Sequence, residues 1–106
     1  MRASASRRVF KNIQKITTKI CNVKEFTDNR KIFLEARNII ETASKKGITG
    51  GKVPQNLAAA AVFLSCIRNG HQISRYEMAG NVKTSSTTIQ NIAKELNDKL
   101  RLDISL

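Results

Sequence analysis

The side chains best suited to chemistry in this sequence are amides and hydroxyls near residue 90. Gln90 and Asn91 are adjacent, and a glutamine or asparagine amide can form two hydrogen bonds with the major-groove edge of adenine. Four hydroxyl side chains, residues 85–88, precede them, separated from Gln90 only by Ile89. Only one of the four can cap a helix, and serine and threonine are mediocre helix formers. The surplus hydroxyls therefore favour contacts with DNA phosphates, and the threonine methyls can touch thymine methyls. The competing interpretation is an ordinary polar helix surface.

A helix-turn-helix pattern positions these residues. Ser74 is followed three positions later by Glu77, which is a capping box and predicts a short helix that ends around Val82. A second helix is predicted to begin at Thr84 or Ser85. One face of this helix is apolar and consists of Ile89, Ile92, Ala93, Leu96 and Leu100. The opposite face is polar and consists of Thr87, Asn91, Lys94 and Asp98. Gln90 lies at the boundary between the two faces. Such a helix pair fits the DNA major groove.

Three further helices are predicted upstream. The first has an apolar stripe formed by Val9, Ile13, Ile16 and Ile20. A separate basic stripe on the same helix is formed by Lys11, Lys15 and Lys19. Residues 22–26 are expected to connect it to a second helix, which starts near Thr27 or Asp28 and ends at Gly47. The third, from Pro54 to Gly70, is apolar all round, so we expect other helices to surround it. Residues 101–106 are predicted to be irregular.

The positive charge is unevenly distributed. The formal net charge is +11, and residues 1–24 contain seven basic side chains and no acidic one. DNA phosphates attract such a surface without regard to base sequence. The alternatives are a solubilising face or a patch that binds an anionic membrane.

Composition and motifs argue against several other classes. A chain of 106 residues, 41% hydrophobic, predicts one globular domain, and no apolar run approaches a membrane span or the core of a signal peptide. We therefore expect an intracellular protein. Cys21 and Cys66 are interpreted as buried free thiols, with no spacing that would bind zinc.

No catalytic pattern is recognisable either. The carboxylates form no acid/base pair, and Gly50-Gly51-Lys52 lacks the rest of a phosphate-binding loop. We expect His71 to be a solvated loop residue and Tyr76 to be a core anchor. We therefore predict that the protein is not an enzyme and has no catalytic residues, no metal site and no cofactor.

Two connected segments resemble the second cyclin-like repeat of transcription factor IIB and its archaeal counterpart. The loop Gly47-Ile48-Thr49-Gly50-Gly51-Lys52-Val53-Pro54 precedes an alanine-rich helix, residues 57–64. The resemblance spans about residues 25–100 and continues without a gap through Ser74, Glu77, Met78, Ala79, Thr88, Ile89, Asn91, Lys94, Glu95 and Leu96.

The resemblance implies an all-α, five-helix cyclin-like fold with a C-terminal helix-turn-helix. The whole chain, 1–106, would be a single domain with a basic first-helix region at 1–24 and the helix-turn-helix at 73–100. It implies a general transcription initiation module that binds promoter DNA next to the TATA element. The implied partners are double-stranded DNA, TATA-binding protein and, through upstream domains, RNA polymerase. The location would be the nucleus in a eukaryote or the nucleoid in an archaeon.

The family's DNA contacts are carried over residue by residue. Base contacts are expected from Ser86, Thr87, Gln90 and Asn91. Phosphate contacts are expected from Lys52, Arg75, Lys83, Ser85 and Lys94.

Three residues depart from the family pattern. Lys83 stands where the turn usually has glycine, and Ala93 replaces a tyrosine or phenylalanine. Gln90 replaces an arginine, and this replacement favours adenine over guanine.

The alternative function is a cyclin-fold module that binds other proteins, whose basic surface would meet an acidic partner.

Overall fold

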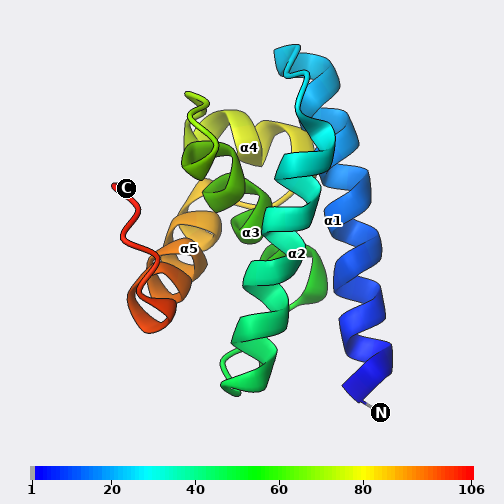
Figure 1. The fold of residues 1–106 in the computed structure, drawn as a ribbon, viewed down its shortest axis with the longest axis vertical. Coiled ribbons are helices and arrows are strands. Elements are labelled where there is room, and N and C mark those ends of the chain that lie inside the picture. The colour runs from blue at the N-terminus through cyan, green and yellow to red at the C-terminus, as the bar shows by residue number, and fades with distance from the viewer. Residues whose placement is uncertain (1) are drawn as a thin grey trace.

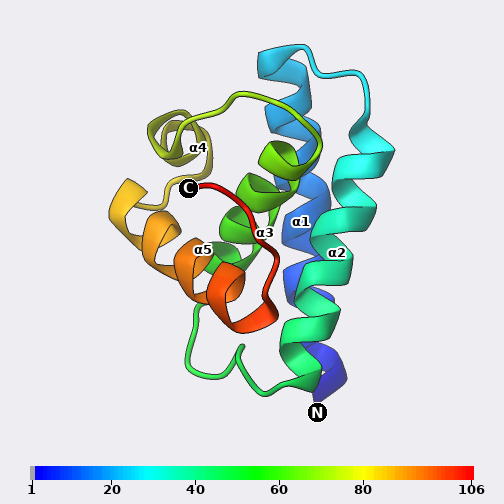
Figure 2. The ribbon, with the colours of Figure 1, turned by 60° about the vertical axis from the view of Figure 1, so that its left-hand side comes forward.

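The protein is described by a computed structural model, which covers the backbone of residues 2–106 and the side chains from Arg7 onward. The described residues form five helices and no strand: α1 (Arg2–Lys24), α2 (Asn29–Lys45), α3 (Pro54–Arg68), α4 (Arg75–Val82) and α5 (Ser86–Leu100). In Figure 1, α1 and α2 lie side by side along the long axis. Figure 2 shows α3 between this pair and α5. The prediction of an all-helical fold is confirmed.

Helix α3 is the centre of the core, as its apolar sequence predicts. It contacts each of the other four helices, and every residue from Leu57 to Cys66 is buried. Pro54 occupies the first turn, where the missing N–H costs no hydrogen bond. The helix ends at Arg68, and Gly70 follows the C-cap residue Asn69 with a φ of +86°, which favours glycine. Hydrogen bonds from His71 N–H to Cys66 O and from Gly70 N–H to Ile67 O complete a Schellman motif.

The connection between α1 and α2 differs from the prediction. Helix α1 continues to Lys24, so most of the expected connector at 22–26 is helical. Asp28 is the N-cap residue of α2 but makes no side-chain cap. Its carboxylate instead lies 2.7 Å from Nε2 of His71.

Two aromatic predictions are wrong. His71 is not simply solvated: its ring stacks on Phe26 with centroids 3.8 Å apart, and it joins the α1–α2 connection to the loop after α3. Tyr76 is not a core anchor, since 64% of it is exposed. His71 owes its position to Asp28 and Phe26, which are far away in the sequence, and local pattern does not report such neighbours. Tyr76 contacts the adjacent Arg75 instead of the core.

The segment after α5 is irregular, as predicted, but it is not detached. It turns back along the molecule and ends near α4 (Figure 2). The Asn97 side chain donates to Ile104 O at 2.7 Å and accepts from Ile104 N–H at 3.0 Å. Leu102 and Ile104 pack against the core, so this tail covers one side of α5.

Candidate nucleic-acid interface

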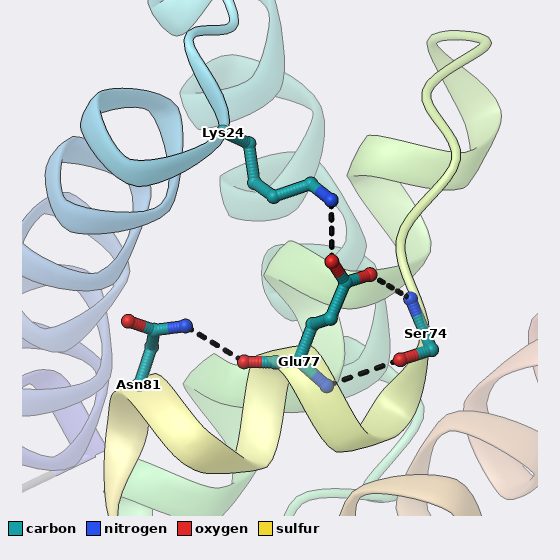
Figure 3. A network of polar contacts seen from close by, with 4 residues as sticks. All are labelled: Lys24, Ser74, Glu77 and Asn81. Carbon is teal, nitrogen blue, oxygen red and sulfur yellow. Dashed lines mark hydrogen bonds and ion pairs between the residues drawn. The ribbon is translucent and has the colours of Figure 1, made fainter.

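The predicted capping box opens α4. Glu77 N–H donates to Ser74 Oγ at 3.1 Å, and Ser74 N–H donates to Glu77 Oε1 at 2.9 Å. The other carboxylate oxygen accepts from Lys24 Nζ, at the end of α1 (Figure 3). The Lys24 ammonium and the Ser74 backbone N–H lower the pKa of Glu77 below its ordinary value. The box therefore also attaches the first helix of the helix-turn-helix to α1.

The turn between α4 and α5 is anchored on the start of α3. Gln55 Nε2 donates to Val82 O, and Thr84 Oγ1 donates to Asn56 Oδ1 at 3.0 Å. Between these anchors, Lys83 has φ +55° and ψ +40°, in the left-handed region. This explains why glycine suits the position: a side chain there crowds the backbone. The anchoring was not visible in the sequence because it links residues about thirty positions apart.

Helix α5 is capped by Ser85, whose hydroxyl accepts from Thr88 N–H at 3.1 Å and donates to Thr88 Oγ1 at 2.8 Å. Its inner face is buried through Ile89, Ile92, Ala93 and Leu96. The outer face is exposed at Thr87, Asn91, Lys94 and Asp98. The predicted division of this helix into an apolar and a polar face is thus confirmed.

The four residues assigned to base contacts do not have equal access to solvent. Thr87 and Asn91 are exposed on the outer face, whereas Ser86 and Gln90 are partly buried at its edge. Gln90 lines a groove of about 790 Å³ whose other walls include the tail residues Ser105 and Leu106. The outer face of α5 therefore presents Thr87 and Asn91 most directly, with Gln90 between that face and the tail.

The five residues assigned to phosphate contacts also differ in environment. Lys83 and Lys94 are exposed, in the turn and on the outer face of α5. Arg75 donates to the Tyr76 hydroxyl at 2.9 Å, with its guanidinium 5.0 Å from the ring centroid. Ser85 is exposed, but its hydroxyl serves the cap.

Lys52 has protein partners that sequence reasoning missed. Its ammonium donates to Ile48 O at 3.0 Å and lies 3.1 Å from Glu95 Oε1, with 19% of the side chain exposed. Hydrogen bonds from Lys52 and, to a smaller extent, from Lys99 lower the pKa of Glu95 below its ordinary value. The Lys52 ammonium thus connects the loop before α3 to α5. Lys52 and Glu95 are 43 positions apart in the sequence. Sequence patterns reveal ion pairs only between residues three or four positions apart on one helix, so no local signal predicted this pair.

Chemistry other than binding has little support among the described residues. They contain no group of three side chains arranged to hold a metal ion. Both cysteines are buried and free, and burial raises the pKa of the Cys66 thiol to about 12. In the described part of the chain, every helix is too short or too polar to cross a membrane.

Comparison with known proteins places these features in a family. A family model described as the transcription factor TFIIB repeat matches residues 6–99. The chain is 37% identical over 75 residues to transcription initiation factor IIB of Aeropyrum pernix, covering 71% of this chain and 23% of that protein. It is 31% identical over 88 residues to the factor of the same name from Pyrococcus furiosus, covering 79% and 29%.

The chain therefore spans about a quarter of the length of these relatives. The match includes the alanine-rich α3 and nearly all of the α4–α5 pair. The five helices accordingly form a cyclin-like fold, and the chain belongs to the transcription factor TFIIB repeat family.

Proposed function

We propose that this chain is a module of a general transcription initiation factor and binds promoter DNA next to the TATA element through α4 and α5. The supporting observation is the exposed outer face of α5, where Thr87, Asn91 and Lys94 follow a turn held by the core. Side chains held on a firmly packed helix can meet base edges in a defined register. The two relatives described above are both named transcription initiation factor IIB.

In the proposed complex, the N-terminal half of α5 enters the major groove. The Asn91 amide pairs with an adenine edge and Thr87 contacts a thymine methyl. Gln90 and Ser86 contact bases at the edge nearest the tail. Lys83 and Lys94 neutralise phosphates on either side, assisted by Arg75, Ser85 and Lys52, and these contacts fix the register without reading sequence.

TATA-binding protein and RNA polymerase are the proposed protein partners. TATA-binding protein would sit on the adjacent TATA element, and polymerase would be reached through other parts of a longer factor. The work of the module is binding, and it needs no cofactor. The module would be located with the promoter DNA, in the nucleus of a eukaryote or the nucleoid of an archaeon.

A binding selection tests this proposal. Duplexes with a TATA element and a randomised flank are selected with the wild-type protein, with and without TATA-binding protein. We expect enrichment of a short adenine-containing sequence beside the TATA element. Asn91→Ala should cost roughly 1–3 kcal/mol on the enriched duplex and little on a scrambled one.

A matched control uses Asn38→Ala, the same change on the exposed surface of α2, which should retain the wild-type preference. If the wild-type protein enriches no sequence and Asn91→Ala binds as well as Asn38→Ala, α5 does not read DNA. The alternative function, a cyclin-fold module for protein partners, would then replace the proposal.

A further inference from the structure

A second basic surface lies where α1 meets the helix-turn-helix. A groove of about 210 Å³ there has Lys15, Lys19, Gln55, Val82 and Lys83 in its lining. Helix α4 packs against α1, and in Figure 1 its ribbon extends toward α1. The fold thus brings two lysines of α1 together with the lysine of the turn that leads into α5.

The charge of this groove is not neutralised within the described part of the protein. Its lining contains no carboxylate, whereas the larger groove beside the tail contains Glu77. Lys15, Lys19 and Lys83 are all exposed. The ion pairs among the described residues use other cations, namely Lys24, Arg37, Lys52, Arg68, His71 and Lys99.

The start of α3 adds to the positive potential of the groove. Gln55 is the second residue of α3, and that helix start has no side-chain cap, so the positive end of its dipole is close by. The C-terminal end of α4 would repel an anion, but Gln55 Nε2 already donates to Val82 O there. Among the described residues, the three lysines are the only charged side chains in the lining of the groove.

We infer that this groove binds backbone phosphates of the same duplex that α5 reads, so that α1 is a second arm of the DNA interface. This rests on the proposed function. Lys11, Lys15 and Lys19 repeat every four residues and so form a row about 12 Å long. Each DNA strand carries a phosphate about every 3.4 Å of helix axis, so a row of this length matches a polymer of phosphates better than one small anion.

The test measures duplex binding at several salt concentrations with the variant Lys15→Gln/Lys19→Gln. Removing two phosphate contacts should reduce the slope of log K against log salt by about 1.8. The loss should be equal on the selected and the scrambled duplex, because phosphates carry no base information. Lys15→Arg/Lys19→Arg, which keeps the charge, should retain the wild-type slope.

The matched control is Lys31→Gln/Lys45→Gln, which removes the same charge from exposed positions of α2. Helix α2 makes no contact with α4 in the described structure. If the control lowers the slope as much as the α1 variant, general charge explains the effect and the inference is wrong.

Failure of the two proposals can be told apart. Loss of preference in Asn91→Ala, with no special effect of the α1 lysines, would support reading by α5 and overturn the second arm. A wild-type protein without any sequence preference would overturn the proposed function. In that case the slopes on the scrambled duplex would still decide whether the groove binds phosphates.

Discussion

The ammonium of Lys52 lies 3.1 Å from the Glu95 carboxylate and ties the loop before α3 to α5. The same lysine belongs to the family's glycine-rich loop, where a phosphate contact was expected. The ammonium already contacts two protein acceptors, Ile48 O and the Glu95 carboxylate. We therefore expect that its main role is to hold α5 in position.

Lys52→Ala and Lys94→Ala should therefore behave differently. Lys52→Ala should lower the free energy of unfolding by up to about 1 kcal/mol, because it breaks a partly buried ion pair. Lys94→Ala should leave stability unchanged and weaken binding to all duplexes about equally, with a slope lower by about 1. Urea titrations and salt-dependent binding measure the two effects. A large loss of salt dependence in Lys52→Ala at unchanged stability would instead mean that its phosphate contact outweighs its ion pair with Glu95.

Stability should fall in acid because of Glu77. Its pKa is lowered in the folded protein from a reference value of 4.5, so the unfolded state binds more protons between the two pKa values. The contribution is complete above about pH 4.5 and is lost as pH falls through the folded-state pKa. In Glu77→Gln the melting temperature should be lower near neutral pH and should change less across this acid range. An equally steep acid loss in Glu77→Gln would assign the effect to other carboxylates, such as Glu95.

Lys83→Gly should change stability and DNA binding in opposite directions. The φ of +55° is strained for lysine and comfortable for glycine, so we expect the free energy of unfolding to rise by up to about 1 kcal/mol. Losing the ammonium should lower the salt slope by about 1. Thermal melts and duplex titrations report the two changes.

Lys94→Gly provides the contrast for this substitution. It removes the same side chain from the interior of α5, where glycine costs about 1 kcal/mol. If both variants lose stability, strain at the turn is not significant.

Gln90 is predicted to contribute to base preference at one position. Gln90→Arg, which introduces the family's usual residue, should shift that position from adenine toward guanine. Gln90→Ala should cost roughly 1–3 kcal/mol on the preferred duplex and less than Asn91→Ala, because Gln90 is partly buried beside the tail. Selections with both Gln90 variants decide this. Unchanged preferences in both would remove Gln90 from the interface.

The sequence by itself determined the helices and the polarity of each face. Periodic apolar residues, the Ser74–Glu77 capping box and Pro54 act within one or two turns of helix, so their consequences are readable locally. The same holds for the outer face of α5, which follows from residue spacing alone. The predicted bounds of α3 and α5 were therefore close to the structure, whereas α1 continues into the expected connector and ends at Lys24.

The tertiary structure decided which polar residues already have partners. Lys52 with Glu95, His71 with Asp28 and Phe26, and Gln55 with the turn at Val82 all join segments far apart in the sequence. It also brought Lys15 and Lys19 next to Lys83. Such pairings depend on how the helices pack against α3, and no period or spacing within a single segment encodes that arrangement.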